Sequence, residues 1–562
     1  MTEDGNPVLR SEQFDDVYFS AEDGLAETRY VFLDGNHLPE AFGGTQHFII
    51  FETGFGTGLN MLSAWALFEE TARPDQRLDF ISVEKYPLSR AQIRDALHHW
   101  QGAFGEKLSR LLALYPLRVP GPHKLYLTDK VTLTLWFSDV DDALASTDVP
   151  VDAWFLDGFA PKKNPDMWSD NLFQQMARLS HAETTYATFT AAGQVRRGLE
   201  EVGFSVDRLP GFGRKRHMIR GRFQKGKPRV MVTSPRSIAI IGGGLAGTAL
   251  AWHACKRGAS VSLYEAGPSL ASGGSGGRLG MINPKLTARP SIESEYFTSA
   301  YANALRVLSD LPDVDFSMPG NHHLRLDAGK ARKFDGYINN LGWHADHIHL
   351  EGEDLVFPDG GCVSPQKVCA RLSEGADVHL NSRVEMLDEL NEDLIILAVG
   401  HRVRDLFSNA PFVNPVRGQV SWIRPRNGRR RNLCFGGYLT PECSDGFHVL
   451  GSTFASGFDE TDVREDDHLA NLERYNTLVK PEVPLTRDDV TGGWAGVRAV
   501  CRDRMPLVGS LSGNRVLVSA AHASHGIMSS LMAADILMSQ SFGEPVPARG
   551  RILAAIAPYR FW

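Results

Sequence analysis

Several features that mark other classes of protein are scarce or missing in this chain of 562 residues. It has only six cysteines and no C-x-x-C pair, which argues against a disulfide framework and against a zinc site. No window approaches the roughly 20 consecutive apolar residues of a membrane-spanning helix. Residues 1–10 also lack the basic and then apolar layout of an export signal. We therefore expect a cytoplasmic protein with free thiols, no metal and no membrane partner.

The composition is that of an ordinary folded protein. With 43% hydrophobic and 22% charged residues and 54 glycines, it excludes disordered, collagen-like and coiled-coil classes. At roughly 100–200 residues per domain, the length predicts three to five folding units. A monomer is the default expectation for the oligomeric state.

Charge is distributed unevenly along the chain. The formal net charge of −8 argues against attraction of the whole surface to a polyanion. Between Arg208 and Arg236, however, ten basic residues occur with no acidic residue among them, and a second basic cluster lies at 424–431. Such runs can neutralise phosphates, although a basic linker or a solvated face is the commoner explanation of any single run. Charge alone leaves nucleic acid binding open.

The sequence contains, twice, a short apolar strand followed by a glycine-rich turn and a helix, which predicts two nucleotide-binding α/β folds. The segment between them is rich in Arg, Lys, Gly, Pro and Ser and has no regular periodicity. We therefore predict a first domain at 1–220, a basic linker at 221–236 and a second domain at 237–562.

In the first domain, the strand 47–52 leads into a G-x-G-x-G turn and a helix at 59–69. Glycines there allow a ligand to approach the backbone closely. Further strands are expected at 78–83, 131–137 and 151–156. Each of the four strands ends at or next to an acidic residue, and the turn glycines and acids are Gly54, Gly56, Gly58, Glu52, Glu84, Asp139 and Asp157.

These acids match the groups of a methyl donor. Glu52 can pair with the ammonium or sulfonium of S-adenosylmethionine, Glu84 can accept from both ribose hydroxyls, and Asp139 can accept from the adenine amino group. Any one of them is explained equally well as an ordinary turn residue or a solvent-facing acid. The ordered set favours a class I, Rossmann-like methyltransferase.

Asp157 opens the loop Asp157-Gly-Phe-Ala-Pro161, which continues to Trp168. This loop resembles the acidic, proline-containing and aromatic loops that hold an amine or a flat base in amino-group methyltransferases. Methylation of nitrogen needs a free lone pair, and a carboxylate can accept or orient the amine proton. Asp157 is therefore the candidate catalytic residue of the first domain.

The second domain has G-x-G-x-x-G at Gly242, Gly244 and Gly247, between a predicted strand at 237–241 and a helix. Glu265 ends the next strand and can bind an adenosine ribose. The segment 393–400 resembles the second strand that contacts FAD in FAD-binding folds. The flexible segment 272–278, which includes Arg278, favours a wrapped FAD over NAD, with a plain flexible loop as the alternative.

Near the end of the chain, Gly492-Gly-Trp-Ala-Gly-Val-Arg498 and the segment 521–527 resemble the glycine oxidase and D-amino-acid oxidase superfamily. The resemblance implies that Arg498 holds a substrate carboxylate. It also implies that the helix opening at His525 and Gly526 faces the flavin. For His522 and His525, packing or capping is a better explanation than proton transfer.

This resemblance divides the second domain into two parts. FAD binding is assigned to 237–290, 358–410 and 491–562, and a substrate subdomain to 291–357 and 411–490. Arg417, Gly418 and Gln419 are candidates for the oxidase pocket, and a structural ion pair explains Arg417 equally well.

Taken together, the motifs Glu52–Asn60, Asp157–Pro161 and Gly211–Arg216 and their order resemble the bifunctional MnmC family over nearly the whole chain. The resemblance implies two steps at the tRNA wobble uridine. FAD-dependent removal of a carboxymethyl group gives 5-aminomethyl-2-thiouridine, and methylation then gives the 5-methylaminomethyl product. It places Asn60 in the methyl-donor site and implies an RNA contact at Arg214, Lys215 and Arg216.

Two other functions remain open. One is a glycine or sarcosine type of amine oxidase fused to a methyltransferase that acts on a free amine. The basic runs disfavour it, because a free amino acid needs no polycationic approach surface. The other is a non-catalytic RNA-binding or scaffold protein, which the intact glycine and acid sets disfavour.

Overall fold

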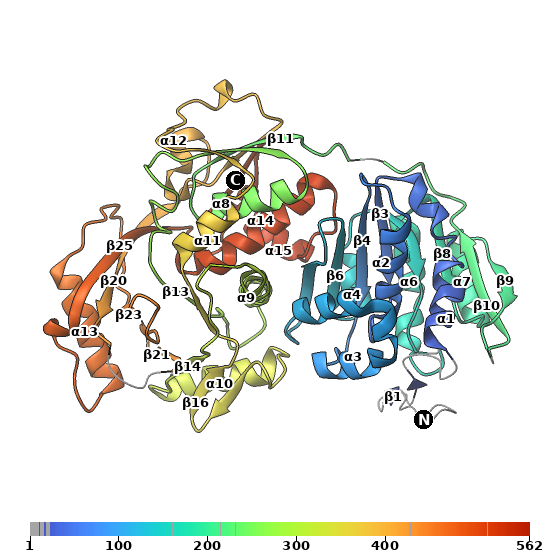
Figure 1. Cartoon of the computed structure of the whole chain (residues 1–562), viewed down its shortest axis with the longest axis horizontal. Helices are drawn as coiled ribbons and strands as arrows, with labels where there is room; N and C mark the ends of the chain where they lie inside the picture. The colour runs from blue at the N-terminus through green and yellow to red at the C-terminus, as the bar shows by residue number, and fades with distance from the viewer. Residues whose placement is uncertain are drawn as a thin grey trace. The chain divides into compact units, whose positions relative to one another are not determined.

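The computed structural model describes residues 10–11, 16–17, 23–159, 161–213, 215–230, 232–425, 430–513 and 515–562. The chain divides into unit 1, which is Met1–Thr233 with Gly543–Arg549, and unit 2, which is Ser234–Phe542 with Gly550–Trp562 (Figure 1). Within the described ranges, no helix combines the length and the apolar character needed to cross a membrane. All six cysteines are free thiols, as expected.

Unit 1 is built on an eight-stranded sheet in the order β5-β6-β4-β3-β7-β8-β10-β9. Strands β6, β4, β3, β7 and β8 are parallel, and the others join the two edges antiparallel. The four predicted strands are confirmed to within one residue. The strands are β3 (His47–Glu52), β4 (Arg77–Val83), β5 (Gly121–Tyr126), β6 (Val131–Phe137), β7 (Val151–Phe155), β8 (Ser180–Thr188), β9 (Asp207–Pro210) and β10 (His217–Arg222).

Helices cover both faces of this sheet, so the central strands are buried on both sides. In β3, Phe48 and Ile50 pack in the cluster that includes residues of α2 and α4. Ile49 and Phe51 pack on the opposite face with residues of α6 and α7. The helices are α1 (Gly24–Thr28), α2 (Leu59–Thr71), α3 (Arg90–Leu97), α4 (Gln101–Leu114), α5 (Val140–Ala145), α6 (Asp170–Leu179) and α7 (Gly193–Val202).

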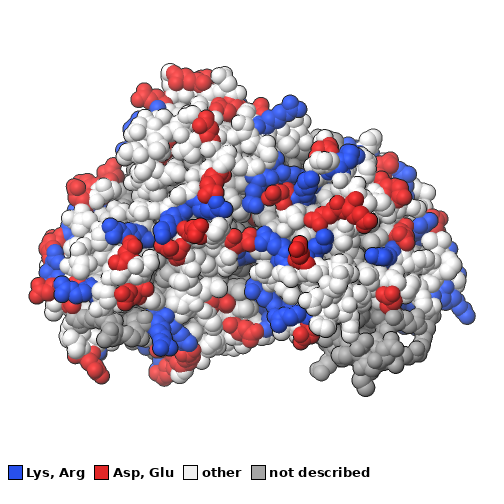
Figure 2. Space-filling view, in the orientation of Figure 1, with Lys and Arg blue, Asp and Glu red and all other residues white. Residues whose placement is uncertain are grey.

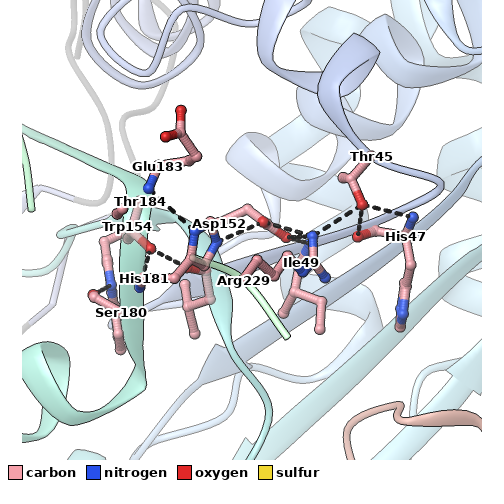
Figure 3. Close-up of polar contacts among 12 residues, drawn as sticks. Thr45, His47, Ile49, Asp152, Trp154, Ser180, His181, Glu183, Thr184 and Arg229 are labelled. Atoms are coloured by element: carbon pink, nitrogen blue, oxygen red, sulfur yellow. Dashed lines mark hydrogen bonds and ion pairs between the residues drawn. The ribbon is translucent and has the colours of Figure 1, made fainter. Parts of the chain in front are cut away.

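A buried ionic cluster around Asp152 fixes the segment that follows this sheet (Figure 3). Arg229 Nη1 donates to Asp152 Oδ1 at 2.7 Å and to Thr45 Oγ1 at 3.1 Å. The Ile49 amide donates to Asp152 Oδ2 at 2.7 Å, and His181 Nε2 lies 2.9 Å from Oδ1. Much of the segment 221–236, predicted as a linker, is therefore packed on unit 1, which extends to Thr233.

Residues 543–549 also belong to unit 1, although they come from near the end of the chain. The ammonium of Lys124 has no exposed side-chain surface, and it donates to Glu544 Oε2 at 2.7 Å and to the Pro545 carbonyl at 3.1 Å. Arg549 Nε donates to Asp142 Oδ2 at 2.8 Å. The sequence analysis assigned these residues to the FAD part, because nothing local in the sequence indicates a return to unit 1.

Unit 2 contains a six-stranded sheet in the order β18-β12-β11-β19-β27-β26. The first five strands are parallel, and β26 is antiparallel to β27. The predicted strands at 237–241 and near 259–264 and 393–400 are confirmed. The bounds are β11 (Ser237–Ile241), β12 (Ser260–Tyr264), β18 (Asp377–His379), β19 (Leu394–Leu397), β26 (Leu507–Ser512) and β27 (Val516–Ala520).

A second sheet of unit 2 has nine strands in the order β15-β16-β14-β21-β22-β23-β20-β24, with β25 paired to β20. Strand β25 was assigned by sequence to the FAD part, but its ladder with β20 places it in this sheet. The strands are β14 (Asn321–His323), β15 (His349–Glu351), β16 (Asp354–Phe357), β20 (Asn414–Ile423), β21 (Asn432–Cys434), β22 (Tyr438–Leu439), β23 (His448–Gly451), β24 (Ala455–Ser456) and β25 (Val490–Val500).

Helix α14 lies almost wholly buried against α8 and α9 in unit 2. Its first residue, Gly526, confirms the helix predicted to open there. A two-stranded sheet joins β13 (Gly280–Ile282) to β17 (Gly361–Val363). The helices are α8 (Leu245–Lys256), α9 (Ile292–Asp310), α10 (Ala328–Asn340), α11 (Pro365–Leu372), α12 (Val403–Leu406), α13 (Glu465–Val479), α14 (Gly526–Phe542) and α15 (Gly550–Ile556).

We predict that Glu544→Gln lowers the free energy of unfolding by about 3–5 kcal/mol, because it removes the carboxylate that faces the buried ammonium of Lys124. Urea unfolding followed by tryptophan fluorescence measures the loss. Glu295→Gln is the matched control, since Glu295 pairs with the exposed Arg551 and such pairs contribute about 0–1 kcal/mol. Equal losses in the two variants would contradict the role of Glu544.

Candidate functional site

Strands β3 and β7 are parallel neighbours, so their carboxyl ends bring Glu52 and Asp157 to one edge of the unit 1 sheet. The turn after β3 approaches the same place closely. A Cβ atom on Gly54 would lie 3.1 Å from the Asp157 carbonyl oxygen. Gly56 and Gly58 have φ of 53° and 84°, in the left-handed region that favours glycine. The glycines therefore leave the edge open beside the two acids.

Asn60, in the first turn of α2, joins the two acids. Its Nδ2 donates to Glu52 Oε1 at 2.8 Å and to Asp157 Oδ2 at 2.7 Å. Its Oδ1 accepts from Thr28 Oγ1 at 2.8 Å, which fixes the orientation of the amide. We call Thr28, Glu52, Asn60 and Asp157 the Asn60 cluster. One amide thus holds two carboxylates in a fixed relation.

Both carboxylates of the Asn60 cluster resist ionisation. Burial raises the pKa of Glu52 well above its usual value, and the neighbouring charge of Asp157 raises it further. Burial raises the pKa of Asp157 to about 6, against the hydrogen bonds from the Gly158 amide and from Asn60. A cation bound here would stabilise the ionised forms, so the cluster fits a positively charged ligand such as the methyl donor.

Lys215 reaches the same neighbourhood from the turn before β10. Its Nζ lies 2.6 Å from Glu27 Oε1 and 4.1 Å from the centroid of the Phe189 ring, and its charge lowers the pKa of Asp157. Lys215, predicted to contact RNA, is thus ion-paired beside the Asn60 cluster. Arg216 is exposed, as an RNA contact requires, whereas Arg214 lies outside the described residues.

The other two predicted donor-site acids take different positions. Glu84 accepts from the Gly56 amide at 3.0 Å and from the Tyr86 amide at 2.8 Å, so it supports the glycine turn. Burial raises its pKa. Asp139 is exposed and lies 2.6 Å from Lys85 Nζ. Both lie at the carboxyl edge of the sheet, but neither belongs to the Asn60 cluster.

In unit 2, a cavity of about 1060 Å³ lies at the carboxyl ends of β11 and β12. We call it the β11 cavity. Gly242 has φ of 111°, and a Cβ atom on Gly247 would lie 1.8 Å from the Gly242 carbonyl oxygen, so both positions require glycine. The predicted residues that line this cavity are Gly242, Gly244, Glu265, Arg498, His525 and Gly526.

Backbone amides of two neighbouring loops fix the carboxylate of Glu265. Its Oε2 accepts from the Gly243 amide at 2.8 Å, and its Oε1 accepts from the Gly267 amide at 2.7 Å. The glycine cradle at the start of α8 suits a pyrophosphate, and a carboxylate at the end of β12 suits a ribose. The β11 cavity therefore fits a dinucleotide such as FAD.

Arg278 does not line this cavity, contrary to the sequence prediction. Its guanidinium lies 4.4 Å from the centroid of the Trp422 ring and 3.8 Å from Asp445. Its neighbours Gly277 and Leu279 line the β11 cavity, whereas Arg278 lines a separate pocket of about 430 Å³. Stacking of the guanidinium on the ring of Trp422, which lies in β20 of the nine-stranded sheet, accounts for this orientation.

Arg498 enters the β11 cavity from β25. Its Nη2 donates to Ser452 Oγ at 3.1 Å, and its guanidinium lies 4.6 Å from the centroid of the Phe454 ring. A Cβ atom on Gly418 would lie 1.7 Å from Arg498 Nη1, so glycine there makes room for the side chain. Burial lowers the pKa of Arg498, and in the described part of the chain no acidic side chain pairs with it.

The histidines beside this arginine are neutral. Burial lowers the pKa of His522 and that of His525 to about 4. His522 Nδ1 lies 2.9 Å from Ser529 Oγ, and the His525 ring packs on Phe297, which agrees with packing roles.

Arg417 faces away from the β11 cavity. It lies 2.5 Å from Asp467 Oδ2 and donates to Gln419 Oε1 at 3.0 Å. Of the two interpretations left open by the sequence, the structural ion pair is therefore correct.

Sequence reasoning missed several residues that complete the two sites. Thr28, Glu27 and Ser82 act on the Asn60 cluster, and Ser82 Oγ donates to Glu52 Oε2 at 2.6 Å. In the β11 cavity, Tyr438 and Phe454 flank Arg498. None of them belongs to a motif, and Phe454 lies far from Arg498 in the sequence, so no local signal singles them out.

Comparisons with known proteins assign each unit. Residues 103–224 match a family described as S-adenosyl-L-methionine-dependent methyltransferase, and residues 237–540 match one described as FAD dependent oxidoreductase. The chain thus carries an N-terminal methyltransferase domain that uses S-adenosylmethionine and a C-terminal oxidoreductase domain that uses FAD.

Several solved structures resemble the second of these domains. Glycine oxidase from Geobacillus kaustophilus is 20% identical with a TM-score of 0.48, covering 58% of this chain and 99% of that chain. L-proline dehydrogenase from P. horikoshii is 14% identical with a TM-score of 0.49, covering 59% and 98%. Iminodiacetate oxidase from Chelativorans sp. BNC1 is 17% identical with a TM-score of 0.46, covering 57% and 98%. The oxidoreductase family match, residues 237–540, spans more than half of this chain. The chain therefore belongs to the FAD dependent oxidoreductase family.

Proposed function

We propose that this chain modifies the wobble uridine of tRNA in two successive steps, as the bifunctional MnmC family does, and that it acts as a cytoplasmic monomer. The oxidoreductase domain removes the carboxymethyl group from 5-carboxymethylaminomethyl-2-thiouridine. The methyltransferase domain then converts the 5-aminomethyl group to 5-methylaminomethyl. The pairing of the two domains in one chain and the motifs Glu52–Asn60 and Asp157–Pro161 support this proposal.

The observation that carries the proposal is the guanidinium of Arg498, which lines the β11 cavity with no acidic partner in the described chain. A half-buried, unpaired guanidinium of this kind is completed by a carboxylate, and bidentate pairing would orient that carboxylate. The carboxymethylamino side chain of the uridine is an N-substituted glycine and carries such a carboxylate. The exposed ring of Phe454 beside Arg498 gives the uracil base a face on which to stack.

In the first step, a hydride leaves the methylene carbon of the carboxymethyl group and the nitrogen loses a proton, which leaves a C=N double bond between nitrogen and that carbon. Water adds to the imine, the C–N bond breaks, and glyoxylate and the aminomethyl uridine are released. When bound, FAD supplies the two-electron acceptor and S-adenosylmethionine supplies the methyl group. Arg498 holds the carboxylate, and the neutral His522 and His525 add no competing charge.

In the second step, Asp157 accepts a proton from the amine at its carboxylate, which frees the nitrogen lone pair. Asn60 holds Asp157 in place, and Glu52 pairs with the ammonium of the methyl donor. The exposed Arg216 is a candidate contact for the RNA backbone, with Lys215 and Arg214 beside it in sequence. Figure 2 shows basic and acidic side chains interspersed on the visible face, so local contacts of this kind are the expected mode of RNA binding.

The experiment that tests the proposal is mass spectrometry of wobble nucleosides in tRNA treated with the purified protein. Undermodified tRNA should lose the carboxymethyl group with FAD and gain a methyl group with S-adenosylmethionine. Free glycine and sarcosine, tested in parallel, represent the small-molecule alternative. Activity confined to those two compounds would overturn the proposal.

We predict that Asp157→Asn lowers kcat for methyl transfer by about 10²–10⁴ and leaves carboxymethyl removal intact, so that aminomethyl uridine accumulates. Because the pKa of Asp157 is raised to about 6, its ionised form is lost as the pH falls. The rate of methyl transfer by the wild type should therefore fall as the pH drops through about 6. The variant should lack this fall in its pH profile.

Asp139→Asn is the matched control, because Asp139 is an exposed acid outside the Asn60 cluster. It should raise KM for the methyl donor and leave kcat unchanged. Unimpaired methyl transfer by Asp157→Asn would remove Asp157 from the mechanism.

We predict that Arg498→Gln lowers kcat/KM for carboxymethyl removal by about 10²–10³, because the substrate carboxylate loses its charged partner. Methylation of tRNA that already carries the aminomethyl group should not change, since Arg498 belongs to unit 2. Single-turnover reduction of the flavin, followed by absorbance, measures the effect. The control is Arg417→Gln, which removes a structural arginine and should act through stability.

A further inference from the structure

A second hollow in unit 2 has no role in the steps proposed above. It is a groove of about 1540 Å³ to which four arginines contribute, namely Arg404, Arg502, Arg504 and Arg560. We call it the arginine groove. Among the described residues, no acidic side chain lines it. The groove therefore presents positive charge on a chain whose net charge is −8.

Two of these arginines are available to a partner. Arg502 and Arg504 are exposed, and in the described ranges neither side chain forms a hydrogen bond or an ion pair. Arg404 is also exposed and stacks on Phe412, with its guanidinium 5.5 Å from the ring centroid. Arg560, in contrast, is held by Asp503 at 2.8 Å. The free cations therefore lie along one part of the groove.

Exposed aromatic rings lie in the same groove. Phe412 is 62% exposed and Trp562 is 64% exposed, so both rings present a face to solvent. The polar side chains Ser408, Asn409 and Ser512 also line the groove. The groove thus combines ring faces, cations and hydrogen-bonding groups.

The arginine groove adjoins the β11 cavity. Strand β25 contributes Arg498 to the cavity and Val500 to the groove. The two residues are two positions apart and so lie on one face of the strand, roughly 7 Å from each other. The segment that leads from β23 into β24 does the same, with Phe454 in the cavity and Ser456 of β24 in the groove. A large substrate with one group at Arg498 can therefore extend into the groove.

We propose that the arginine groove binds an unpaired RNA strand, with phosphates on Arg502 and Arg504 and bases stacked on Phe412 and Trp562. The proposal rests on the function proposed above, since it assigns a docking surface to the same substrate. Cations that track a backbone, together with aromatic faces for bases, are the features by which proteins hold single-stranded nucleic acid. An acidic protein would use the arginines and would leave the ring faces without a matching group.

The test uses the full-length, FAD-loaded protein and a fluorescently labelled anticodon stem-loop RNA. Binding is measured by anisotropy at several salt concentrations. The double variant Arg502→Glu and Arg504→Glu should bind at least tenfold more weakly. It should also reduce the slope of log K against log salt by about 1.4, because each of the two single-strand phosphate contacts contributes about 0.7. Phe412→Ala should weaken binding by about tenfold without changing the slope.

Arg332→Glu with Lys333→Glu is the matched control, because it makes the same change of charge on exposed residues of α10 that line neither hollow. The free nucleoside 5-carboxymethylaminomethyluridine reports separately on the β11 cavity. It should reduce the flavin at the wild-type rate in every variant, since it is too small to need the groove.

Three results would overturn the groove assignment. One is an RNA affinity and a salt slope that do not change in the double variant. Another is a loss of RNA affinity in the α10 control as large as that in the double variant. The third is competition by polyglutamate as strong as that by polyuridylate at equal charge, which would identify an acidic protein as the partner. In each case the wild type still binds and oxidises the RNA. A wild type that ignores the stem-loop altogether would instead refute the proposed function.

Discussion

Parallel strands direct their carboxyl ends to one edge of a sheet, and both catalytic domains depend on this constraint. In unit 1 it brings Glu52 of β3 next to Asp157 after β7, where one amide can hold both. In unit 2 it brings the glycine turn after β11 next to Glu265 after β12. The chemistry of each domain then depends on the side chains and backbone amides that the loops and the following helix place at that edge.

Each site also contains charge that the protein alone leaves uncompensated. Glu52 is buried and Asp157 beside it is half-buried, and their removal from water keeps both pKa values high. Arg498 is the reverse case, a half-buried cation without an acid beside it among the described residues. Such arrangements reduce the stability of the empty protein and are compensated when a ligand of opposite charge binds. The proposed function pairs the two sites with ligands of opposite sign, a cationic methyl donor in unit 1 and an anionic side chain in unit 2.

The sequence predicted those parts of the molecule that short-range rules determine. The strands β3, β4, β6, β7 and β11 and their turns follow from apolar runs and glycine spacing, and all appear as expected. Long-range pairing was not predictable in this way. The apolar pattern of β25 does not reveal that it pairs with β20, and Arg278 gives no indication that it stacks on Trp422. Thr28 and Lys215 reach the Asn60 cluster only through the folded chain.

The seven residues Gly543–Arg549 belong to unit 1, although the chain before and after them belongs to unit 2. Because they supply Glu544 to the interior of unit 1, the methyltransferase domain is discontinuous in the gene. A frameshift or stop codon ahead of Gly543 would therefore damage both units at once. The same discontinuity disfavours separation of the two halves by a simple gene split, since the upstream product would lack a part of its own interior.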